Sequence, residues 1–279
     1  MKIKNKVLLV MRYTFKSLQH PYYGGVAAEL AFYLLLSIVP TATLVGVFSG
    51  AFSTSLSLII ELVKSYTPKE FYTAVIPYLE EPPTSNMGIF FMVISIWLAS
   101  RGFHSVIRIS NFAYGVPSKS NFIIRDRIKA MKITFLFIFM ILFSLSIVIF
   151  GELIGEFITS NSLDIFNNEI IINKIWYTLR WPLGFVVFYY ILLYIYYTSV
   201  NKKMSYKNFR IGALFATIGI IISSVIFSFY VKYFGNYNII YGSLASVAIL
   251  MLWSYIISLV IVIGIQINVA YARFFCKTE

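Results

Sequence analysis

The chain alternates between long apolar stretches and short polar segments. A helix needs about 20 mostly apolar residues to cross a hydrocarbon core about 30 Å thick. Six stretches meet this length, at residues 25–52, 87–111, 133–157, 176–200, 211–234 and 243–271. They are apolar at nearly every position, whereas strands of a membrane barrel alternate between lipid-facing and lumen-facing residues. The pattern predicts an all-α polytopic membrane protein, a bundle of six transmembrane helices.

Composition supports one membrane domain over residues 1–279. Hydrophobic residues make up 59% of the chain and charged residues 12%, against about 25% charged in soluble domains. No Gly/Ser-rich or Pro-rich linker divides the chain. The apolar run at residues 7–11 is too short for a signal peptide, so we expect the first span to be retained. The single cysteine, Cys276, leaves no partner for an intramolecular disulfide.

Two segments outside the spans have amphipathic patterns. Residues 1–24 predict a basic interfacial helix at the inner membrane surface, which would anchor the first span. Its apolar side is formed by Ile3, Val7, Val10, Met11, Thr14 and Leu18, and its cations are Lys6, Arg12 and Lys16. Residues 53–87 predict short amphipathic helices on the outer surface, one beginning at a capping box from Thr67 to Glu70. They would form either a structural cover or a gate.

The distribution of Lys and Arg sets the orientation, because cytoplasmic loops keep an excess of them. With both termini inside, only five of the 23 are outside, namely Lys64, Lys69, Lys174, Arg180 and Lys232. We therefore expect a multi-pass protein of the bacterial plasma (inner) membrane with cytoplasmic N- and C-termini. This topology accounts for the net charge of +12, so no nucleic-acid partner is expected.

The second span carries a polar stripe near its inner end. At 100° per residue, Arg101, His104, Arg108 and Asn111 lie within an arc of about 80°. Charge at this depth costs about 2.5 to 3.5 kcal/mol unless it snorkels, pairs or faces water. Two interpretations remain open: the arginines either anchor the helix at lipid phosphates or line a polar cavity. His104 is more typical of a satisfied hydrogen-bonding group than of a proton carrier.

Other spans add polar residues at the same level. Glu29 is an acid within the first span, and pairing with Arg101 or Arg108 would offset its burial cost. Pro40, farther along this span, is a possible hinge. The last span contributes Gln266 and Asn268, and amides at such depth usually join helices. In the fifth span Gly212, Ala216, Gly219 and Ser223 form a small-residue face for close packing.

Three of these segments resemble a known family. ELAFYLLLSIVP at residues 29–40, WLASRGFHSVIRISNFAYGV at residues 97–116, and YGSLASVAILMLW with GIQINVAYAR at residues 241–273 are similar to the YihY / virulence factor BrkB family. The resemblance implies six spans, cytoplasmic termini and a bacterial inner-membrane location. Labels used within that family range from ribonuclease BN to a lipid-related transporter. Many relatives carry an acid where this chain has Gln266.

The residues do not favour an enzyme. Hydrolysis of phosphodiesters by metal ions requires clustered Asp, Glu or His facing water, and the inner loops offer few. No P-loop, Ser-His-Asp set or HExxH pattern is present, so we expect no catalytic residues, no metal site and no cofactor. Two hypotheses remain. The first is a transporter or flippase-like handler of an anionic lipid or lipid-linked substrate, and the second is a non-transporting scaffold that binds structural lipids and partners. A homo-oligomer remains open under both.

The hypothetical substrate site is Glu29, Arg101, His104, Arg108, Asn111, Gln266 and Asn268. Under the first hypothesis Arg101 and Arg108 attract phosphate or carboxylate, and Glu29 balances them when the site is empty. Asn111, Gln266 and Asn268 would then orient the headgroup.

Overall fold

The structure is a computed structural model that describes residues 3–51, 85–117, 124–139, 169–234 and 245–275, with residues 60, 64, 76–77 and 80 as isolated positions. Every element in these ranges is helical, as predicted. The helices are α1 (Ile3–Leu18), α2 (Pro21–Ala51), α5 (Ser85–Ala113), α7 (Glu169–Ser199), α8 (Arg210–Phe234) and α10 (Ala245–Phe275), with a 3-10 turn η1 (Tyr206–Phe209) before α8. A further helix covers residues 124–139.

Five helices coincide with predicted apolar stretches, namely α2, α5, α7, α8 and α10. Three described segments are long and apolar enough to cross a membrane: Pro182–Ser199, Tyr206–Tyr230 and Val247–Phe275. The six-span count stays a prediction, because residues 140–157 of the third stretch and nearly all of the outer segment lie outside the described residues. The backbone of α2 remains helical through Pro40, and a hinge there also stays a prediction.

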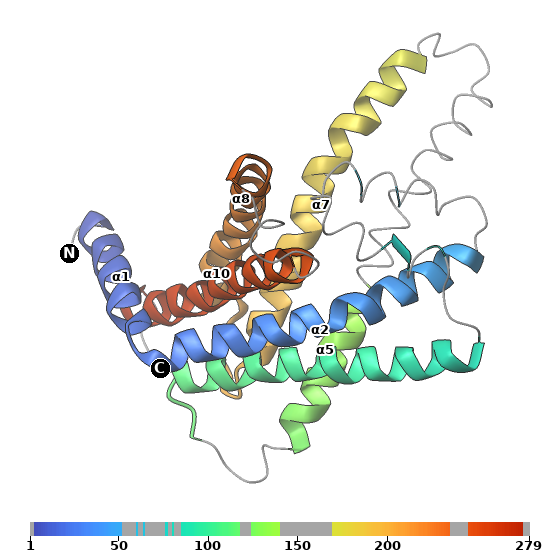
Figure 1. Cartoon of the computed structure of the whole chain (residues 1–279). Helices are drawn as coiled ribbons and strands as arrows, with labels where there is room; N and C mark the ends of the chain where they lie inside the picture. Colours follow the sequence, from blue (N-terminus) through green and yellow to red (C-terminus); the bar gives the residue numbers. More distant parts are fainter. Residues whose placement is uncertain are drawn as a thin grey trace.

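The two longest paired surfaces are α2 against α5 and α8 against α10, and α10 also packs on α1 and α2 (Figure 1). The core is formed by buried residues of these helices, such as Ala27 and Leu30 of α2 and Ile107 of α5. On α8, large apolar side chains remain 42% to 62% exposed at Phe215, Ile222 and Ile226. A helix so apolar on its outer side is suited to lipid rather than water.

Helix α1 packs its inner side on the end of α10. The Lys6 ammonium lies 5.1 Å from the Phe275 ring centroid, and the Tyr13 and Phe274 rings meet edge to face. Leu8, Met11 and Phe15 are instead 65% to 70% exposed. A helix is therefore present at Ile3–Leu18 within the predicted residues 1–24. Its contacts differ from the predicted wheel, since Lys6 faces α10 and Met11 is exposed. Its placement at the membrane interface stays a prediction.

The C-terminal end of α5 is fixed by a glycine turn. Gly115 has a φ of 64°, which favours glycine because other residues clash there. The Val116 N–H donates to the Asn111 carbonyl at 2.8 Å, and the Gly115 N–H donates to the Phe112 carbonyl at 3.0 Å. This pair of bonds is a Schellman motif, and it satisfies carbonyls at the helix end. The turn explains the glycine of the motif's Tyr-Gly pair and follows the end of the helix at Ala113.

Candidate functional site

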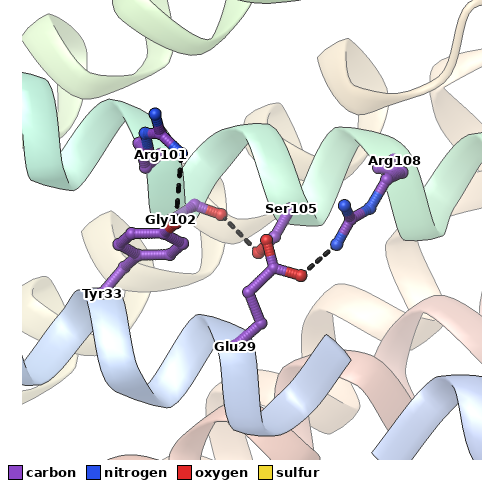
Figure 2. A network of polar contacts seen from close by, with 6 residues as sticks. All are labelled: Glu29, Tyr33, Arg101, Gly102, Ser105 and Arg108. Carbon is purple, nitrogen blue, oxygen red and sulfur yellow. Dashed lines mark hydrogen bonds and ion pairs between the residues drawn. The ribbon is translucent and has the colours of Figure 1, made fainter. Parts of the chain in front are cut away.

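Two polar contacts, an ion pair and a hydrogen bond, join helices α2 and α5 (Figure 2). Near the start of α2, Glu29 forms an ion pair with Arg108 near the end of α5. One turn farther along α2, the Tyr33 hydroxyl accepts a hydrogen bond from Arg101 Nη1 at 3.4 Å. The order of the contacts shows that the helices run antiparallel. Sequence reasoning predicted a Glu29 ion pair with one of two arginines, and the structure selects Arg108.

The Glu29–Arg108 pair is only partly shielded from solvent in the isolated protein. The side chains of Arg108 and Glu29 are 46% and 34% exposed. Ion pairs of this exposure contribute about 0 to 1 kcal/mol in water, and a lipid surround would strengthen them because the dielectric constant is lower. The pair neutralises one of the two predicted cations of the stripe.

Arg101 is in a different environment from Arg108. Its guanidinium carbon lies 5.8 Å from the Trp97 ring centroid, and the guanidinium carbon of Arg127, on the helix at residues 124–139, lies 6.0 Å from the same ring. Within the described residues, neither arginine forms an ion pair with a carboxylate. Two positive charges therefore lie around one aromatic side chain, and no acid among these residues neutralises them.

His104 lies on the same side of α5, one turn from Arg101 and from Arg108. It is half-buried and interacts electrostatically with the cations Arg127 and Arg108 and with the acids Asp126 and Glu29. Its buried Nδ1 atom has no hydrogen-bond partner in the described part of the chain. Ser105 of the same turn donates to the Gly102 carbonyl at 2.7 Å and so is locally satisfied. His104 therefore retains hydrogen-bonding capacity among both basic and acidic side chains.

Asn111 belongs to a separate polar cluster at the end of α5. Its Oδ1 accepts from the Asn201 N–H at 2.8 Å, and Asn201 Nδ2 donates to Asp126 at 2.7 Å. The Lys129 ammonium donates to Asn201 Oδ1 at 2.6 Å. Burial lowers the pKa of Lys129, with Arg125 adding to this shift and Asp126 opposing it. These contacts join α5, the helix at residues 124–139 and the segment after α7, so Asn111 has a structural partner.

The two amides of α10 serve helix contacts. Gln266 Oε1 accepts from the Ser17 hydroxyl of α1 at 2.8 Å, and Asn268 Oδ1 accepts from the Gly212 N–H in the first turn of α8 at 2.7 Å. Both side chains are 1% exposed. Their amide nitrogens, Nε2 and Nδ2, have no partner among the described residues. In that part of the chain neither amide hydrogen-bonds to Arg101 or Arg108.

Several residues of these polar clusters were not recognised as site residues from sequence, among them Trp97, Asp126, Arg127 and Asn201. Asp126 and Arg127 lie in a basic stretch typical of an inner loop, and Asn201 follows a span end. A polar residue near a predicted helix end is too common a signal to single any of them out. The Trp97 to Arg101 spacing of four residues did place both on one face.

The fold and the polar contacts define a class: a helical membrane protein that carries charged and amide side chains at one end of its bundle. The chain belongs to the Virulence factor BrkB family, whose pattern it matches over residues 14–277. All seven predicted site residues lie within the matched range. The resemblance found in the sequence is therefore confirmed.

Curated relatives cover most of the chain. Ribonuclease-like protein YfkH of Bacillus subtilis (strain 168) is 31% identical over 245 residues, which are 87% of this chain and 87% of that protein. A UPF0761 membrane protein of Vibrio campbellii is 26% identical over 93% of this chain and 81% of its own length. One of Vibrio cholerae is 27% identical over 93% of this chain and 85% of its own length. No solved structure matches the chain.

The ribonuclease-like name belongs to the Bacillus protein. Among the described residues of this chain, no group of three or more His, Cys, Asp or Glu side chains lies together where a metal ion would bind. The expectation that the chain is not an enzyme stays a prediction.

Proposed function

We propose that this membrane protein handles an anionic lipid or lipid-linked substrate in the cytoplasmic half of its bundle, as a transporter or flippase-like protein. The observation that carries the proposal is the unequal neutralisation of the two α5 arginines. Arg108 is paired with Glu29, whereas among the described residues the contacts of Arg101 are with the neutral groups of Tyr33 and Trp97. An arginine without a counter-ion at this depth is costly, and an anionic ligand would offset that cost.

Glu29 has a distinct role in this proposal. It holds Arg108 when no substrate is bound, and a phosphate that reaches both arginines competes with it. Arginine suits this role, because its planar guanidinium makes paired, charge-assisted hydrogen bonds to phosphate. Asn111, Gln266 and Asn268 are engaged in helix contacts, so the arginines carry the recognition.

The competing function is a scaffold that binds structural lipids without moving them. The two hypotheses differ in transport, so the protein is reconstituted in vesicles containing fluorescent phosphatidylglycerol, and movement between leaflets is followed by chemical quenching of the outer leaflet. We expect the wild-type protein to accelerate this movement. We expect Arg101→Lys to reduce both this rate and the anionic lipid retained on purification, although charge is conserved.

Lys64→Ala, which changes an exposed cation on the predicted outer side, is the matched control and should behave as wild type. A snorkelling anchor predicts equal retention in Arg101→Lys and wild type, because lysine reaches interfacial phosphates nearly as well. Retention without any accelerated movement would favour the scaffold.

A further inference from the structure

We infer that Arg101, Arg127 and Trp97 form a docking site for an anionic phospholipid, reached sideways from the membrane. Arg127 is a residue that the proposed function does not use. This inference rests on the proposed function only for the anionic class of the ligand. It adds the second helix that builds the site and the direction from which the ligand arrives.

The first support is the charge arrangement. The guanidinium groups of Arg101 and Arg127 come from two different helices and lie 5.8 and 6.0 Å from the same Trp97 ring centroid. The carboxylate next in sequence to Arg127, that of Asp126, accepts a hydrogen bond from Asn201. Glu29 pairs with Arg108. Among the described residues, neither of these acids forms an ion pair with the two guanidinium groups, whose positive charge attracts an anion.

The second support is the apolar surface that leads to these charges. Phe90, Val93 and Trp97 of α5 are 62%, 61% and 59% exposed. With Arg101 they are spaced by three, four and four residues, so they form one line along an exposed helix face. In a membrane-spanning helix such a line meets acyl chains. Along α5 this surface is therefore apolar from Phe90 to Trp97 and cationic at Arg101.

The dimensions favour a lipid over a free phosphate. From Phe90 to Arg101 is eleven residues, or about 16 Å at 1.5 Å per residue. This is about half of a hydrocarbon core about 30 Å thick, a length comparable to one acyl chain. In the predicted orientation Phe90 lies near the outer end of the span at residues 87–111, and the arginines lie on its cytoplasmic side. A headgroup at the arginines would therefore place its acyl chain along Val93 and Phe90, which no soluble phosphate needs.

The test measures tryptophan quenching by lipids with brominated acyl chains in vesicles. The full chain is reconstituted with either brominated phosphatidylglycerol or brominated phosphatidylcholine, and Trp97→Phe identifies the contribution of that residue. We expect Trp97 to be quenched preferentially by phosphatidylglycerol. Arg101→Gln and Arg127→Gln should each lower this preference about threefold, the size that one partly exposed ion pair supports.

The matched control is Lys132→Gln, an exposed cation on the same helix as Arg127, which should leave the preference unchanged. An equal loss in Lys132→Gln would reduce the effect to general surface charge and overturn the site. Reversal of the quenching by millimolar inorganic phosphate would identify a soluble anion as the ligand and overturn it as well. If Arg101→Gln abolishes lipid movement while Arg127→Gln and Trp97→Phe leave the preference intact, this inference fails and the proposed function stands.

Discussion

The α2–α5 surface and the α8–α10 surface use polar groups in opposite ways. Between α2 and α5, Glu29 and Arg108 form an ion pair that stays partly exposed. Between α8 and α10, Asn268 is 1% exposed and binds a backbone N–H beside glycines. The first surface keeps charge near the boundary of the bundle, where a ligand can compete for it. The second uses a neutral amide, that of Asn268, at a close backbone contact where an added Cβ would collide.

The closeness of the α8–α10 contact rests on Gly212 and Gly264. A Cβ added at Gly212 would collide with the Gly264 carbonyl and the Asn268 side chain, and one at Gly219 would lie 2.8 Å from Val260 Cγ1. Small residues allow helix backbones to approach in membranes, where the lipid is as apolar as the side chains and burial alone does not drive helices together. The predicted small-residue face of α8 is thus a packing face at Gly212 and Gly219.

The largest expected effect comes from Gly212→Ala. The new methyl group meets the Gly264 carbonyl of the backbone as well as the Asn268 side chain, so we expect a loss at or above the upper end of about 1 to 3 kcal/mol of stability, or failure to fold. The measurement is the temperature at which the detergent-purified protein loses its monodisperse elution peak. Gly24→Ala is the control, because nothing lies within 4 Å of its added Cβ and alanine favours the helix. Equal melting of the two variants would contradict the close contact.

A smaller effect is expected for Asn268→Leu. The change leaves the Gly212 N–H in the first turn of α8 without its acceptor, at a cost of about 1 to 3 kcal/mol for a buried donor. Gln266→Leu removes a partner from the Ser17 hydroxyl, which rotates to find another acceptor, and should cost less. Thermal unfolding of both variants in the same detergent tests the ranking. A greater loss in Gln266→Leu would refute it.

The smallest effect is expected on the α2–α5 surface. In a double-mutant cycle, Glu29→Gln and Arg108→Gln should couple by about 0.5 to 1 kcal/mol, because solvent screens a half-exposed pair. Stability is measured by denaturant titration in mild detergent. The parallel cycle of Glu29→Gln with Arg101→Gln should show weaker coupling. Coupling that is larger with Arg101 would reverse the assignment of the pair.

The elements themselves were predicted well from the sequence, because a membrane helix is specified locally by an apolar run of sufficient length. The stretches at residues 25–52 and 211–234 match α2 and α8 within a few residues at each end. The face that places Arg101, His104 and Arg108 together is also local, since it follows from helix geometry alone. The tight contact at Gly212 was foreseen from residue size.

The sequence by itself determined the helical membrane class, the family and the clustering of polar residues toward the predicted cytoplasmic end. Only the tertiary structure decided which groups meet: Glu29 with Arg108, Asn268 with the start of α8, and Arg127 with Trp97. The reason is physical. A hydropathy pattern fixes which residues enter the membrane, but the rotation and register of each helix depend on packing and polar contacts with its neighbours.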